Sequence, residues 1–114
     1  SFSPAVITEG GRTVWLAGQT TLTDLEGNDI AGKFEAQART IFELIKRTLA
    51  RVGGTLENMV TMTVFINDPR NGDRFVQIRQ EYFPGARCPG SALVTVSNFA
   101  RPGCVIEIQG VAVI

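Results

Sequence analysis

The spacing of apolar residues predicts one long helix in the first half of the chain. From Phe34 to Val52, apolar residues recur every three or four positions, which is the period of an amphipathic helix that buries one face. Gly53 and Gly54 follow directly, and glycine readily takes the left-handed conformation that ends a helix. We therefore expect a helix over residues 34–52.

Alternation with a period of two predicts a strand from Val60 to Ile66, where β-branched residues are frequent. Shorter runs typical of strands cover Ala5–Thr8, Thr13–Gln19, Ala92–Ser97 and Cys104–Val113. The turn pair Gly10-Gly11 separates the first two of these runs, so we expect them to form a hairpin.

A second helix is predicted before Pro84, because Phe75, Ile78 and Tyr82 fall on one helical face. The resulting order of elements is ββαβαββ. It predicts an α+β domain with a mixed sheet that two helices cover on one face. A chain of 114 residues fits one such domain, residues 1–114. The uncovered face would be apolar, so we expect it to be buried against identical subunits in a closed oligomer.

Composition narrows the classes of function. The chain has 11 basic and 11 acidic residues and no basic run, so no nucleic-acid partner is predicted. No apolar run approaches the roughly 18 residues of a membrane helix. The first residues also lack the basic and apolar regions of a signal peptide. We therefore expect a cytoplasmic protein with no membrane partner.

The chain has no histidine, which removes every histidine-dependent triad and the histidine zinc motifs. Any catalysis must use carboxylates, backbone amides, arginine, lysine or thiols. Cys88 and Cys104 lack the spacing of a metal or redox motif, so we interpret them as reduced thiols, with Cys104 packed in or near the core. No metal site and no cofactor are predicted.

Six short segments carry a resemblance that covers nearly the whole chain. They read Phe-Ser-Pro-Ala-Val at residues 2–6, Val-Trp-Leu-Ala-Gly-Gln at 14–19, Gln-Ala-Arg at 37–39, Thr-Val-Phe-Ile-Asn-Asp at 63–68, Tyr-Phe-Pro-Gly at 82–85 and Val-Ile-Glu-Ile at 105–108. Each segment falls on or beside an element that the patterns predict. In this order they resemble the RidA (YjgF/YER057c) family, also labelled endoribonuclease L-PSP.

The resemblance implies a chorismate-mutase-like fold and a homotrimer that binds small molecules in clefts between subunits. It also implies cofactor-independent hydrolysis of enamines or imines, with release of ammonia. Glu107 matches the family glutamate that positions the attacking water, although alone it fits a solvent residue at a strand edge equally well. Gly18 matches a glycine that lets a ligand approach backbone N–H groups. Phe2 matches an aromatic position, commonly tyrosine, that closes the cleft.

One departure weakens the deaminase hypothesis. The family has an arginine that clamps the substrate carboxylate, whereas this chain has Ser91 there, which suits a neutral or differently placed polar group. Arg87, in the loop before Ser91, is a candidate replacement. Two hypotheses therefore stand: a deaminase-like hydrolase with an atypical substrate, and a non-catalytic metabolite-binding or regulatory trimer. A third, an endoribonuclease or translation inhibitor, has no support in the residues.

Overall fold

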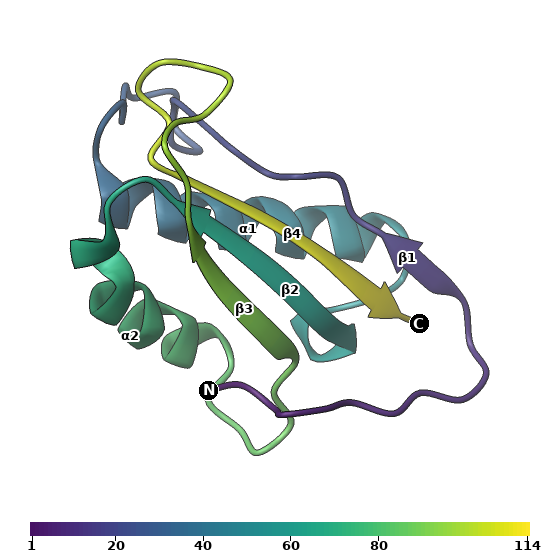
Figure 1. The fold of residues 1–114 in the computed structure, drawn as a ribbon. Coiled ribbons are helices and arrows are strands. Elements are labelled where there is room, and N and C mark those ends of the chain that lie inside the picture. The colour runs from purple at the N-terminus through teal and green to yellow at the C-terminus, as the bar shows by residue number, and fades with distance from the viewer.

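The computed structural model describes residues 1–114 as two helices packed on a four-stranded sheet (Figure 1). The helices are α1 (Phe34–Arg51) and α2 (Gly72–Tyr82), and the strands are β1 (Thr13–Trp15), β2 (Met59–Ile66), β3 (Gly90–Thr95) and β4 (Ile106–Val113). Short 3₁₀ turns at Leu56–Asn58 and Pro69–Asn71 precede β2 and α2. The predicted α+β class is confirmed.

The sheet has the strand order β1-β4-β2-β3. Strand β4 lies in the middle and runs antiparallel to both β1 and β2, whereas β2 and β3 are parallel, so the sheet is mixed as predicted. The parallel pair requires a crossover, which α2 provides. Strands β1 and β3 form the two edges.

The core lies between α1, α2 and one face of the sheet. On α1 the predicted apolar stripe is buried, including Ala38, Ile41, Ile45 and Leu49. Alternate residues of β2 and β4 face this layer, which is what a period of two dictates when one sheet face is covered. Cys104 is 2% exposed and is a free thiol, as predicted.

The predicted N-terminal hairpin is wrong. Ala5–Thr8 forms no strand, and the strand predicted over Thr13–Gln19 ends at Trp15. The amide of Ser3 donates to Pro89, just before β3, and Arg12 exchanges two backbone hydrogen bonds with Ile114, just after β4. Because β2 lies between β3 and β4, residues between these tethers must cross the end of the sheet and cannot run along β1 (Figure 1).

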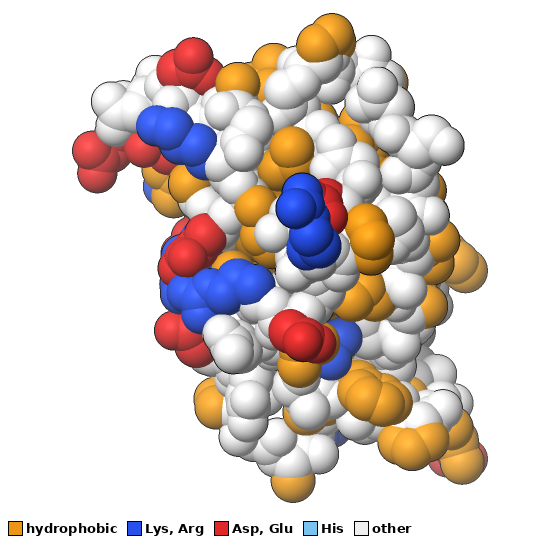
Figure 2. Space-filling model, turned by 60° about the vertical axis from the view of Figure 1, so that its left-hand side comes forward, with side chains coloured by type: hydrophobic (Ala, Val, Ile, Leu, Met, Phe, Trp, Pro, Cys, Tyr) orange, Lys and Arg blue, Asp and Glu red, His pale blue; other side chains and the backbone are white.

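Most charged side chains of the two helices are paired on the surface. Arg39 contacts Glu35 within α1 at 3.2 Å and Glu81 of α2 at 2.8 Å, and Arg74 of α2 contacts Glu35 at 2.5 Å. Figure 2 shows basic and acidic side chains lying next to one another, with hydrophobic side chains between them. This face therefore carries no extended patch of one sign. Neither helix is long and apolar enough to cross a membrane.

Candidate functional site

Glu107 lies on the sheet face that the helices leave open. Its neighbours Ile106 and Ile108 are fully buried toward the helices, so alternation along β4 turns Glu107 to the opposite side. Gly18 packs against it, and a Cβ atom at that position would overlap the Glu107 carboxylate. Gln19 fixes this approach by exchanging two backbone hydrogen bonds with Ile108, at 2.8 and 3.1 Å.

The Glu107 carboxylate makes no hydrogen bond and no ion pair within the chain. It borders a shallow hollow of about 220 Å³. The other lining residues are Phe65, Val96, Asn98, Phe99 and Ala100, which are mostly apolar. Both carboxylate oxygens are therefore free to accept hydrogen bonds from a water molecule or a ligand.

The open face around Glu107 is apolar and exposed. Trp15 is 79% exposed, and its register with Val111 places it on this face. Val94 of β3 is 40% exposed. It pairs with Phe65 of β2, which in turn pairs with Glu107, so Val94 lies on this face as well. Large apolar side chains of this kind usually pack against a partner.

Ser91 faces the helices, because it pairs with the buried Met62. There its hydroxyl accepts a hydrogen bond from Nη1 of Arg79, at 2.9 Å. Arg79 lies near the end of α2, is only 5% exposed, and also donates from Nε to the Ser1 hydroxyl at 2.9 Å. No carboxylate lies within ion-pair distance of its guanidinium.

Two aromatic rings lie next to the Arg79 guanidinium. Its central carbon lies 5.6 Å from the ring centroid of Phe2 and 5.6 Å from that of Phe75. Burial lowers the pKa of Arg79 from its ordinary value, and the nearby Cys88 thiol opposes this shift. A guanidinium keeps its proton across the physiological range, so Arg79 is a desolvated positive charge.

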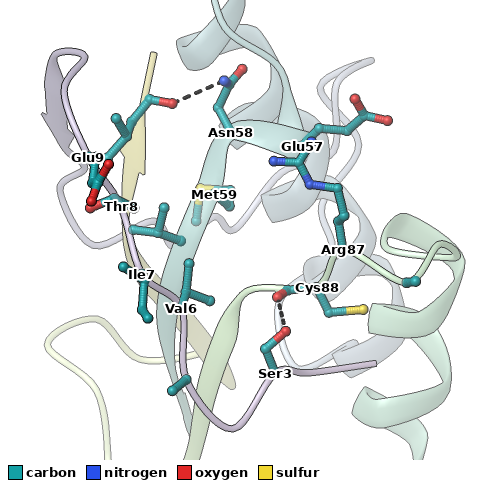
Figure 3. Close-up of a pocket in the computed structure, with 14 residues that line it drawn as sticks. Ser3, Val6, Ile7, Thr8, Glu9, Glu57, Asn58, Met59, Arg87 and Cys88 are labelled. Carbon is teal, nitrogen blue, oxygen red and sulfur yellow. Dashed lines mark hydrogen bonds between the residues drawn. The ribbon is translucent and has the colours of Figure 1, made fainter.

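Arg87 belongs to a different place in the structure. It is exposed in the loop before β3 and lines a pocket of about 540 Å³ beneath the N-terminal segment. In Figure 3 its side chain extends toward Glu57, which lies in the 3₁₀ turn before β2. The hydroxyl of Ser3 donates to the carbonyl of Cys88 on the far side of this pocket (Figure 3).

The five residues proposed from the sequence therefore fall in three places. Gly18 and Glu107 meet on the open face, Phe2 and Ser91 meet around Arg79, and Arg87 stands apart. From the strand register, Ser91 lies about 10 Å along the strands and about 10 Å across them from Glu107. Since the two side chains also point to opposite faces, one chain does not bring them into one site.

Sequence reasoning missed Arg79, although the sequence contains a signal for it. Arg79 follows Phe75 by four positions and precedes Tyr82 by three, so it lies on the same helical face as these apolar residues. A charged residue on an apolar helical stripe is costly to bury without a partner. That position marks Arg79 as a residue with a role beyond solvation.

Comparisons with known proteins agree with the geometry. The model of a family described as Endoribonuclease L-PSP matches residues 1–114. Protein DfrA from Myxococcus xanthus is 33% identical over 112 residues, 98% of this chain and 84% of that protein. The 3-aminoacrylate deaminase RutC from Acinetobacter baylyi is 33% identical over 107 residues, 92% and 82% of the two chains.

Solved structures share the fold. A Rid-family protein of unknown function from Yersinia pestis, YyfB, superimposes with a TM-score of 0.84 at 26% identity. The superposition covers 99% of this chain and 86% of YyfB. The same arrangement of helices and sheet is therefore found in a crystal structure over almost the full length of the chain.

Proposed function

Because the chain belongs to the Endoribonuclease L-PSP (RidA) family, we propose that it is a hydrolase of small enamines or imines that releases ammonia. The observation that carries this proposal is Glu107, a carboxylate without any partner in the chain, held against a glycine on an open apolar face. The likeness to a 3-aminoacrylate deaminase supports the same reaction class.

The chemistry requires one carboxylate and one water molecule. Glu107 accepts a proton from water as the oxygen attacks the carbon of a C=N bond, whose electron pair moves to nitrogen. The Glu107 carboxyl returns this proton to the nitrogen, which gives a neutral carbinolamine. Glu107 then takes the hydroxyl proton of the carbinolamine and passes it to the amine, while the oxygen electrons form the carbonyl bond. The C–N bond breaks, its electron pair leaves with ammonia, and a carbonyl product remains. An enamine enters the same sequence after it tautomerises to the imine.

The test of this function is ammonia release from freshly generated 3-aminoacrylate and 2-aminoacrylate. We expect Glu107→Gln to lower the rate above background by about 100-fold or more, since the amide cannot take the proton. Glu26→Gln, which removes an exposed acid from the loop before α1, is the matched control and should not change the rate. A wild-type rate equal to background would contradict the hydrolase.

We further propose that the chain works as a closed oligomer, with a trimer as the expected form. Two features support this: the exposed apolar side chain of Trp15 on the open face, and the separation of Glu107 from Ser91 within one chain. A neighbouring subunit can supply the second half of a site. Light scattering after size exclusion should give three times the chain mass, and Trp15→Glu should shift it toward the monomer. A wild-type monomer with full activity would contradict this assembly.

A non-catalytic binding protein is the second candidate, because the hollow beside Glu107 is mostly apolar. A binder would give no Glu107-dependent ammonia release but would still bind a small ligand. RNA cleavage has weaker support: the chain has no histidine, its net charge is zero, and its surface charges are mixed in Figure 2.

A further inference from the structure

We propose that Arg79 of α2, together with Ser91, binds the carboxylate of the ligand in this chain. The inference deepens the proposed function and rests on it for the identity of the site, but the binding itself can be measured without turnover. It assigns a role to a helix residue, where the strand carries only a serine.

The first argument is the charge of Arg79. Burying a guanidinium without a counter-ion costs free energy, and folded proteins usually avoid this by pairing the charge. Five ion pairs form elsewhere in the chain, yet none includes Arg79. An anion from outside the chain would complete the pair.

The second argument is the direction of the free donors. Nε and Nη1 of Arg79 donate to the hydroxyls of Ser1 and Ser91, whereas Nη2 makes no hydrogen bond within the chain. No fully buried side-chain nitrogen or oxygen lacks a partner, so Nη2 must reach the surface. The Ser91 hydroxyl accepts from Arg79 and can still donate its own proton. These two adjacent donors suit the two oxygens of one carboxylate.

The third argument is preorganisation. Phe2 and Phe75 flank the guanidinium, and the two serine hydroxyls fix its rotation. A side chain fixed in this way loses little conformational entropy when a ligand binds. Arg79 is the one arginine or lysine side chain that forms a contact at this site, and a lone guanidinium suits one carboxylate better than a phosphate dianion.

The test is a calorimetric titration of the folded protein with pyruvate, with its neutral amide pyruvamide, and with inorganic phosphate. Pyruvate should bind more tightly than either of the others. Arg79→Gln should weaken pyruvate binding by about 30-fold, and Ser91→Ala by about 5-fold. Arg70→Gln, which removes an exposed arginine paired with Asp68, is the matched control and should leave the affinity unchanged.

Several outcomes would overturn the assignment. These are unchanged pyruvate affinity in Arg79→Gln, tighter binding of phosphate than of pyruvate, or loss of pyruvate binding in Arg87→Gln instead. If the only role of Arg79 is to hold the N-terminal segment in place, Arg79→Gln would weaken the binding of pyruvate and of pyruvamide equally. If Arg79→Gln fails to fold, pyruvate binding by Arg79→Lys and Ser91→Ala tests the assignment instead. Lysine keeps the positive charge but lacks the two parallel N–H donors of a guanidinium.

A variant on the other face separates this inference from the proposed function. Glu107→Gln should bind pyruvate at least as tightly as the wild type, because the substitution removes a negative charge and leaves Arg79 and Ser91 in place. If ammonia release proves independent of Glu107 while pyruvate binding still requires Arg79, the hydrolase fails and the carboxylate site stands. If Glu107 controls turnover while Arg79 has no effect on binding, only the carboxylate site fails.

Discussion

Glu107 and Arg79 are both charged side chains without a partner of opposite charge, but the chain holds them in different ways. Glu107 keeps its position because Gly18 leaves room for it, and it makes no hydrogen bond. Arg79 is held by two hydrogen bonds and two aromatic rings. The Glu107 carboxylate is free to accept a hydrogen bond from water, whereas the Arg79 guanidinium has a fixed position and direction.

The difference separates chemistry from recognition. A group that transfers protons needs free oxygens and room to approach the reacting atom. A group that positions a ligand needs a fixed direction. Because the two lie on opposite faces of one sheet, they cannot neutralise each other within the chain. Each is left available to a ligand or to a neighbouring subunit.

The largest expected effect comes from filling the space beside Glu107. A methyl group in Gly18→Ala would push the carboxylate aside, and a displacement of about 1 Å lowers a catalytic rate by about 100-fold. Because the overlapping atom is the end of a flexible side chain, the fold should survive. The measurements are the rate of ammonia release and the thermal unfolding midpoint.

Gly72→Ala is the matched control for this substitution. Gly72 has a helical backbone with φ −61°, and the nearest atom to an added Cβ would be 3.6 Å away. Its rate should equal that of the wild type, and its stability should be equal or higher. A Gly18→Ala protein with full activity would show that the contact with Glu107 has no role in catalysis.

The next effect concerns stability at Arg79. If the buried guanidinium serves a ligand and not the fold, Arg79→Met should raise the free energy of unfolding by about 1 kcal/mol, because the apolar side chain removes an unpaired charge. Urea unfolding in the absence of ligand measures this change. A loss of stability of similar size would instead make Arg79 a structural link between α2, β3 and the N-terminal segment.

A smaller effect is expected at Phe2. Removing its ring in Phe2→Ala should weaken pyruvate binding by about 3-fold, since one cation–π contact at a partly exposed site is modest. Phe2→Tyr keeps the ring and should keep the affinity. Phe2 is 56% exposed, so neither substitution should alter the unfolding midpoint much. If Phe2→Ala lowered the catalytic rate and left pyruvate binding unchanged, the role of Phe2 would lie in the reaction at Glu107 and not in ligand binding at Arg79.

The smallest expected effect concerns Glu35, which is paired with arginines, in contrast to Glu107 and Arg79. The hydrogen bond from Arg74, and then that from Arg39, lower the pKa of Glu35. Its contribution to stability is therefore fully present above the ordinary pKa of a glutamate and is lost as pH falls through the lowered value. The difference in unfolding midpoint between wild type and Glu35→Gln should be small at pH 7 and vanish in acid. A difference that grows in acid would contradict the pairing.

Sequence periodicity predicted the elements whose stability is local. The stripe on α1 and the alternation of β2 follow from neighbouring residues alone, and both helices were placed correctly. The hairpin at Ala5–Thr8 failed because its tethers at Pro89 and Ile114 lie far away in the sequence. The hydrogen bond between Ser91 and Arg79 also depends on tertiary contact, because no sequence pattern around a serine predicts which residue its hydroxyl will contact.

The position of β4 has a consequence for how the chain folds. The strand made last pairs with both β1 and β2 in the middle of the sheet, and no two neighbouring strands are joined by a tight turn. Every strand pairing must therefore close a long loop, which slows folding. A nascent chain can form α1 early, but its sheet must wait until β4 has left the ribosome. Until then β1 has no partner strand and β2 can pair only with β3, so this is the stage at which a chaperone would be needed most.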